Sequence, residues 1–365
     1  MNKIQFLLGV VVVVALIAVF VGALQPQGLF IFQNKDHALR LGAVFPLTGP
    51  ISSYGQTWSK SFSLAISDFE EQNDVNVDFF IEDSQMDPKL ALSSAQKLIQ
   101  LNNVQAIIPG SSREALAIIP LTEENDVLVV TAASNPKITE NRNFVFRIVP
   151  SDFIQGKDLA QFALNKGLKS FSVLSLQSDY GIGLTNVFEK NLLNGGARID
   201  FKEFFSESET DFRTHLLKIK NAASQGVLII AMDKQYVSIL SQMKELGLKQ
   251  KVFASEVFNS GVVLENTELV KGVVYSKYLA VSNPISSKFE AEYFSRFGEK
   301  PGPFAAETYD ATLVALKALF NSSNSKGAKD FLHTSTFSGV TGNIQFDLNG
   351  EPIGKSFTLV EIPSS

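Results

Sequence analysis

Short apolar runs alternate along the chain with longer segments that carry hydrophobic residues on one face only. Runs rich in β-branched residues predict buried parallel strands, and apolar residues repeating every three or four positions predict amphipathic helices. The expected strands are 39–45, 75–82, 104–108, 127–130, 144–149, 170–176, 198–205, 227–231, 251–254 and 272–278. The expected helices are 56–72, 88–101, 113–124, 152–164, 183–193, 211–223, 235–246, 285–297 and 303–320. This alternation predicts an α/β protein with parallel sheets covered on both faces.

The strands and helices form two successive series of similar layout. The first series ends at Pro150, where we expect the chain to cross from one lobe to another. The second begins at Asp152 and runs to 272–278, which we expect to cross back. Residues 321–327 are expected to form a polar loop, and 337–362 to form hairpin strands that turn at Asp347-Leu348-Asn349-Gly350.

Small polar residues follow two neighbouring strands of the first series. Ser111 and Ser112 come after the strand at 104–108, and Thr131 and Ser134 come after the strand at 127–130. Small ligands bind outside the carboxyl ends of parallel strands, and free amides at a helix start attract anions. With Ser112 as the N-cap of the next helix, these residues predict a carboxylate site. The alternative, that Ser112 and Ser134 only cap turns, stays open.

The amino terminus has a different pattern. Lys3 precedes an apolar run at 4–24, which is long enough to span a membrane. Val21-Gly22-Ala23 also offers a small-residue cleavage pattern, so residues 1–25 are either an anchor or a signal peptide, and we favour the anchor. The position of Lys3 predicts that the chain beyond a linker at 26–38 is exported and tethered to the membrane.

Composition narrows the possible functions. The 365 residues suggest two domains, and a net charge of -5 argues against nucleic-acid binding. Cysteine is absent, which excludes disulfides and thiolate sites. His37, His215 and His333 lie far apart, so no metal site is expected. The sequence lacks the motifs of nucleophilic, metal-dependent and dinucleotide-dependent enzymes, so we expect a protein without cofactor or catalysis that captures a small solute.

Several motifs then point to a known family. The chain resembles the type I periplasmic solute-binding proteins of ABC transporters, in the branch that binds leucine, isoleucine and valine. Six stretches carry the resemblance: L-G-A-V-F-P-L-T-G-P-I-S-S-Y-G from Leu41, E-D-S-Q-M-D-P-K-L-A from Glu82, the Gly110-Ser111-Ser112 loop, T-A-A-S-N-P from Thr131, F-R-I-V-P-S-D-F-I-Q-G from Phe146, and F-S-G-V-T-G-N-I-Q-F-D-L-N-G from Phe337.

The resemblance implies two Rossmann-like lobes joined by three crossing segments, with the ligand between them. It places 39–149 and 279–335 in lobe 1, and 150–278 and 336–365 in lobe 2. It also implies that ABC permease and ATPase subunits are the partners. A ligand-sensing ectodomain that acts through a partner protein is the alternative.

The resemblance also implies a set of binding residues. In amino-acid binders of this family, serines and backbone amides of lobe 1 hold the ligand carboxylate, backbone of the second loop takes part of the ammonium, and an aromatic borders the side-chain pocket. A tyrosine and an acid of lobe 2 close over the charged groups. The matching residues are Tyr54, Ser111, Ser112, Ala132, Ala133, Ser134, Tyr180 and Glu256. Arg113 and the pair Met232-Asp233 depart from the family pattern, which leaves the ligand open.

Overall fold

The computed structural model describes residues 39–279 and 283–364, and the chain from Leu39 onward forms one compact unit. The expected anchor or signal at 4–24 lies outside the described residues. Within the described part, no helix is both long and apolar enough to cross a membrane.

The first sheet is parallel and has the strand order β2-β1-β3-β4-β5. Its strands are β1 (Leu39–Phe45), β2 (Val77–Asp83), β3 (Ala106–Pro109), β4 (Leu128–Thr131) and β5 (Val145–Arg147). In its centre, Leu41 of β1 pairs with Phe79 on one side and Ala106 on the other. β3 and β4 are wholly buried, as expected of central strands in a parallel sheet, whereas the edge strand β2 carries Asp78, Glu82 and Asp83 and is partly exposed.

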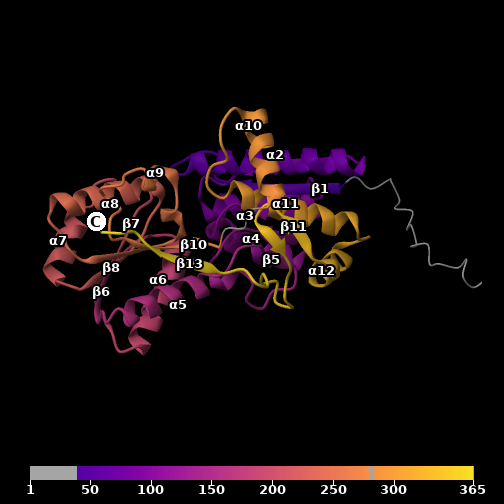
Figure 1. Cartoon of the computed structure of the whole chain (residues 1–365). Helices are drawn as coiled ribbons and strands as arrows, with labels where there is room; N and C mark the ends of the chain where they lie inside the picture. The colour runs from indigo at the N-terminus through magenta and orange to yellow at the C-terminus, as the bar shows by residue number, and fades with distance from the viewer. Residues whose placement is uncertain (1–38, 280–282, 365) are drawn as a thin grey trace, which may run out of the picture. The chain divides into compact units, whose positions relative to one another are not determined.

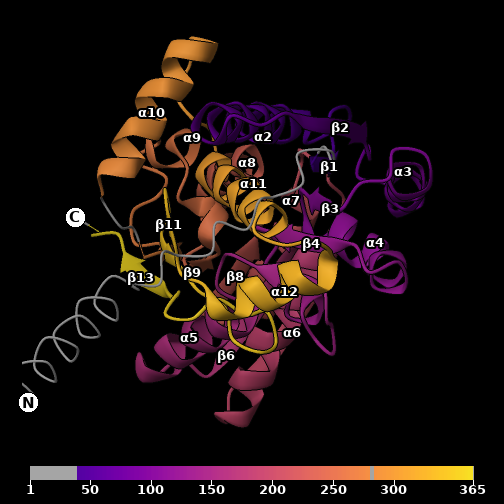
Figure 2. The same ribbon diagram turned by 90° about the vertical axis from the view of Figure 1, so that its right-hand side faces the viewer.

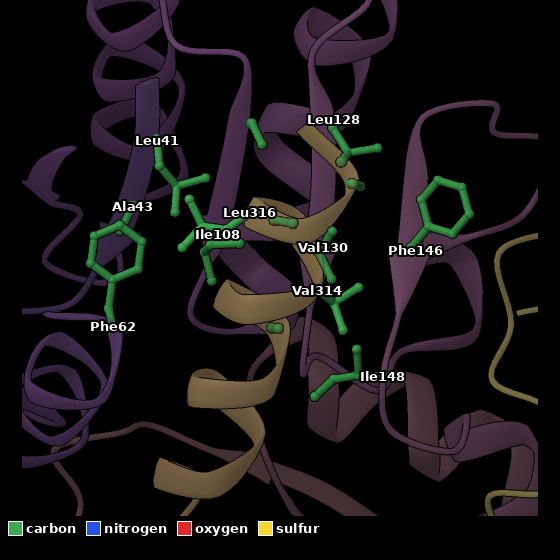
Figure 3. Packing of buried hydrophobic residues seen from close by; sticks show 14 of the residues in the cluster. Leu41, Ala43, Phe62, Ile108, Leu128, Val130, Phe146, Ile148, Val314 and Leu316 are labelled. Carbon is green, nitrogen blue, oxygen red and sulfur yellow. The ribbon is translucent and has the colours of Figure 1, made fainter. Parts of the chain in front are cut away.

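Helices cover both faces of this sheet. α2 (Ser52–Asn73), α11 (Ala305–Phe320) and α12 (Ser325–Thr334) pack on one face, and α3 (Pro88–Gln100) and α4 (Ser112–Glu124) pack on the other. Figure 2 shows α2 and α11 side by side, and Figure 3 shows α11 placing Val314 and Leu316 against Ile108 and Val130. We define lobe 1 as this sheet with its helices.

The second sheet has the order β13-β10-β9-β8-β6-β7. Its strands are β6 (Ser170–Leu176), β7 (Arg198–Phe205), β8 (Gly226–Ile230), β9 (Lys251–Ala254), β10 (Val274–Tyr278) and β13 (Phe357–Glu361). All neighbours are parallel except β13, which pairs antiparallel with β10 beside it in Figure 1. α5 (Asp152–Asn165) and α6 (Asp179–Asn194) cover one face; α7 (Arg213–Ala222), α8 (Asp233–Glu245) and α9 (Gly261–Leu264) cover the other. We call this assembly lobe 2.

The two sheets follow the same plan. Read from β7, the second sheet has the order β7-β6-β8-β9-β10, which repeats the order β2-β1-β3-β4-β5 of the first. In both sheets the order reverses beside the first strand, at β1/β3 and at β6/β8. Ligands bind at such reversal points, at the carboxyl ends of the strands. The two-lobed α/β fold expected from the sequence is therefore confirmed.

Most predicted elements are confirmed, and two local predictions are wrong. The expected loop before Gly183 is helical from Asp179, because Ser178 caps the helix by accepting from the Gly181 amide. The expected polar loop at 321–327 gives way to α12 from Ser325, capped by Asn324. In the C-terminal segment, β11 (Phe337–Gly339) pairs with β12 (Gly342–Ile344), and the expected turn at Asp347–Gly350 is present between Phe346 and Pro352, which form an antiparallel bridge.

The remaining elements lie near the chain crossings. α10 (Pro284–Phe297) begins after Asn283, whose side chain caps it. Phe337 and Ile344 of the C-terminal hairpin pack in the core of lobe 1, while β13 joins the sheet of lobe 2. η2 (Glu256–Phe258) directly follows β9 and brings Glu256 to the carboxyl end of the second sheet.

Candidate ligand-binding site

A cavity of about 90 Å³ lies between the carboxyl ends of the two sheets and is lined by residues of both lobes. The structure brings all eight predicted site residues to its wall: Tyr54, Ser111, Ser112, Ala132, Ala133, Ser134, Tyr180 and Glu256. Their role in binding stays a prediction.

The turn at Ser111 and Ser112 uses its two hydroxyls differently. Ser111, rather than the expected Ser112, is the N-cap of α4, and its Oγ accepts from the Arg113 amide at 3.2 Å. Its own proton goes to the buried carboxylate of Glu114 in the first helical turn. Ser111 is therefore a structural cap, and the sequence did not reveal this because either serine has the side chain that an N-cap requires.

The hydroxyl hydrogen of Ser112 remains available to a group in the cavity. Its Oγ accepts from the Asn135 amide at 3.3 Å, which ties the turn after β3 to the turn after β4. A hydroxyl that accepts from a fixed amide still has one donor, and that donor suits a carboxylate. Within the described part of the chain, the Ser134 amide has no acceptor and can serve the same end of a ligand.

Ser134 has the opposite character because its hydroxyl donates to Oδ2 of Asp152 at 3.0 Å. The Ser134 oxygen can then only accept a hydrogen bond from a group in the cavity, and an ammonium group is a suitable donor. Arg147 fixes this loop: its Nη1 donates to the carbonyls of Ser134 and Asn135 at 2.7 Å each, and its Nη2 contacts Glu351.

Two buried acids, Glu256 and Asp152, lie at the Ser134 end of the site. Oε2 of Glu256 accepts from the Tyr180 hydroxyl at 2.8 Å and from Nε2 of Gln155. Burial raises the pKa of Glu256, against the lowering effect of these two hydrogen bonds. Burial and the nearby charge of Glu256 raise the pKa of Asp152 well above its ordinary value, and Ser134 and Arg147 oppose that rise. Such acids gain from a cationic partner.

Glycines allow both site tyrosines to approach the strand ends. A Cβ on Gly181 would lie 2.2 Å from the Leu176 carbonyl oxygen, and one on Gly55 would lie 2.1 Å from the Pro46 carbonyl oxygen. Only glycine lets the first turns of α6 and α2 pack this closely. In both lobes, the residue after the site tyrosine is therefore glycine for the same reason: any side chain there would collide with a carbonyl oxygen at the end of the preceding strand.

The remaining wall is apolar and aromatic. Tyr54 packs edge-on against Trp58 at 5.9 Å between ring centroids, and against Phe304 at 6.4 Å. Trp58 is held by a hydrogen bond from its Nε1 to the Pro303 carbonyl at 3.2 Å. Burial, followed by the charge of Asp233, raises the pKa of Tyr54. This side of the cavity suits an apolar group.

Sequence reasoning missed several residues of the site. Asp152 was expected only as a helix start, which is the usual role of an aspartate at that position. Arg147 and Gln155 act through other residues, so no spacing pattern reveals them. Among the described residues, no group of three histidines or acids could hold a metal ion.

Comparisons with known proteins agree with this geometry. The family described as periplasmic binding protein matches residues 38–365. The leucine-, isoleucine-, valine-, threonine- and alanine-binding protein of Pseudomonas aeruginosa is 25% identical over 93% of this chain and 94% of its own. These relatives are binding proteins rather than enzymes.

Solved structures share the fold. A leucine-binding protein, LivK, from Thermotoga maritima has 28% identity and a TM-score of 0.77, over 89% of this chain and 96% of its own. A solute-binding protein of an ABC transporter from R. palustris in complex with benzoate has a TM-score of 0.80 at 16% identity, over 89% of this chain and 93% of its own, and this likeness shows the fold alone. The chain belongs to the periplasmic binding protein family, in its branched-chain amino acid type.

Proposed function

We propose that this protein captures a small α-amino acid with an apolar side chain between its two lobes and delivers it to an ABC permease. The observation that carries the proposal is the cavity that joins the free Ser112 hydroxyl to the buried acid Glu256. One end suits a carboxylate and the other suits an ammonium. A zwitterion removed from water needs partners for both charges.

The size of the cavity limits the ligand. A water molecule needs roughly 10–15 Å³ of a cavity measured in this way. The 90 Å³ present therefore fits about six to nine non-hydrogen atoms, the size range from alanine to leucine. Peptides and sugars are larger than this range.

Benzoate has a similar size, and an R. palustris neighbour is described in complex with it. The buried acids of the site favour one of these two ligand classes, amino acids or benzoates, over the other. Benzoate would place a second negative group near Glu256 and Asp152, in a buried region where charge repulsion is strong. An ammonium group would neutralise these acids instead, so we favour the amino acid.

Membership in the family implies an extracytoplasmic location. We propose that residues 4–24 anchor the chain in the membrane, which would keep the binding unit close to its permease and raise the effective concentration there. Ligand would dock on lobe 1, and rotation at the chain crossings would bring lobe 2 over it.

A thermal-shift screen of residues 36–365 against amino acids, benzoate and small amines tests the proposal. A ligand at 100 times its dissociation constant should add about 2.7 kcal/mol of stability. We expect that gain with an aliphatic amino acid, and a smaller gain in Ser112→Ala, which removes the free donor. A shift with benzoate and none with amino acids would refute the proposed ligand class.

A further inference from the structure

Arg113 lines the cavity, where α4 of lobe 1 contacts α6 of lobe 2. Its Nη1 donates to the Met86 carbonyl of lobe 1 at 3.0 Å. Its Nη2 donates to the Gln177 carbonyl, just beyond β6 of lobe 2, also at 3.0 Å. The side chain is only 18% exposed, so the guanidinium is held by both lobes at once.

Two carboxylates of lobe 2 face this guanidinium. Oε1 of Glu207 lies 2.8 Å from Nη1, and Oδ2 of Asp179 lies 3.8 Å from Nε. The Glu207 side chain is 13% exposed, and its burial raises its pKa while Arg113 opposes the rise. Ion pairs that are this far removed from water act more strongly than surface pairs, and breaking one leaves a charge without its partner.

The loop that carries Glu207 is braced. Nε2 of Gln235 contacts the carbonyls of Ser206, Glu207 and Glu209 at 3.1–3.3 Å. The ring of His215 lies between two acids, 2.8 Å from Glu203 and 2.6 Å from Glu209. Because the loop backbone is already fixed, little backbone entropy is lost when Glu207 meets Arg113.

We propose that Arg113 and Glu207 form a latch that holds the two lobes together over the cavity and sets how fast bound ligand leaves. This inference rests on the proposed function, since it concerns the retention of the same ligand. Two of the five guanidinium N–H groups already donate to backbone carbonyls, and Nη1 also forms the ion pair with Glu207. Arg113 therefore acts between the lobes and does not bind the ligand carboxylate, although it stands beside the serine turn.

The experiment measures lobe separation without ligand. The chain contains no cysteine, so Lys89→Cys on α3 and Lys190→Cys on α6 give two unique sites for nitroxide labels in the full-length protein. Both positions are exposed. Electron–electron distance measurements are compared for the doubly labelled parent, Arg113→Gln, Glu207→Gln and their combination. Lys202→Gln is the matched control, because it breaks a surface ion pair with Glu189 in lobe 2.

Without ligand, the parent and the control should show the same share of short distances from the closed form, and both latch variants should shift the distribution to longer distances. The combined variant should shift it no further than the single ones, as expected of two residues that act as a pair. With L-leucine as the probe, stopped-flow dissociation should be about tenfold faster in either latch variant, which corresponds to about 1.4 kcal/mol.

Two results would overturn the latch. One is a distance distribution and a leucine dissociation rate in both variants that match those of the control. The other is faster dissociation in Arg113→Gln alone, which would mean that Arg113 binds the ligand directly. If L-leucine fails to bind the parent protein, the proposed ligand class is wrong, and the distance measurement still tests the latch.

Discussion

The hydroxyl of Tyr180 donates to Oε2 of Glu256 at 2.8 Å, and this contact joins the start of α6 to the segment that follows β9. It orients the one acid that lines the cavity directly. An oriented, buried carboxylate is the strongest indication in the site that the ligand carries a positive charge.

Replacing this acid should weaken amino-acid binding most. Glu256→Gln keeps the shape but removes the charge that faces the ammonium, so affinity for an aliphatic amino acid should fall on the order of 100-fold. Glu265→Gln is the control for net charge, because this residue is exposed in the same lobe. Titration calorimetry measures both, and equal affinities in the two variants would contradict the assignment.

Binding should release protons. Burial raises the pKa values of Glu256 and Asp152, and the charge of Glu256 raises that of Asp152 further, so both carboxyls hold their protons to a higher pH than exposed acids do. An ammonium group favours the ionised forms, so affinity should rise with pH as these carboxyls lose their protons. Arg147, Tyr180, Tyr236, Tyr278 and Glu307 are other charged or titratable groups nearby. Calorimetry in buffers of different ionisation enthalpy measures the release, and a binding enthalpy that is independent of the buffer would exclude it.

Glu307, at the start of α11, should make stability depend on pH. Burial, then the charge of Asp310 and more weakly that of Glu256, raise its pKa to about 7, and Lys355 opposes the rise. The folded state therefore holds a proton that the unfolded state has lost between about pH 4.5 and 7, so stability falls as pH rises through this range. Glu307→Gln should raise the free energy of unfolding by up to about 3 kcal/mol at pH 8 and by little at pH 5. Denaturant titrations at the two pH values test this, and an equal effect at both would contradict it.

Gly181 should tolerate no side chain. A Cβ there would lie 2.2 Å from the Leu176 carbonyl oxygen, so Gly181→Ala should destabilise the protein by about 1–3 kcal/mol and displace Tyr180. In contrast, the nearest atom to a Cβ at Gly261 is 3.7 Å away, and Gly261→Ala should change stability by less than about 0.5 kcal/mol. Unfolding curves with and without amino acid compare the two, and equal stability would show that the first turn of α6 can shift without cost.

The sequence predicted the framework well because buried parallel strands leave a plain apolar pattern. β1, β6, β7 and β9 begin and end at the expected residues. α12 was missed because its first turn is polar and its cap, Asn324, stands among serines and asparagines that equally suit a loop. The first residues of the helices were predicted least accurately, because the N-cap depends on which of two adjacent polar side chains accepts a hydrogen bond from a backbone amide.

The sequence indicated part of the cavity wall but not its hydrogen bonds. The eight residues that the resemblance implied all line the cavity, and their role in binding stays a prediction. The resemblance did not show that Ser111 is committed to Glu114 or that Ser134 donates to Asp152, because these contacts depend on residues from other elements. The bridging role of Arg113 also depends on Glu207, 94 positions away in the chain (207 minus 113), and no local pattern links them.

Recognition of both ends of a zwitterion is the property of the cavity on which the proposed function depends. Calorimetry with L-leucine, 4-methylpentanoate and 3-methylbutylamine tests it most directly, because the three share one side chain and differ only in their charged groups. We expect L-leucine to bind at least about 100-fold more tightly than either analogue, since each analogue leaves one set of buried partners unpaired. Binding of 4-methylpentanoate as tight as that of L-leucine would contradict it.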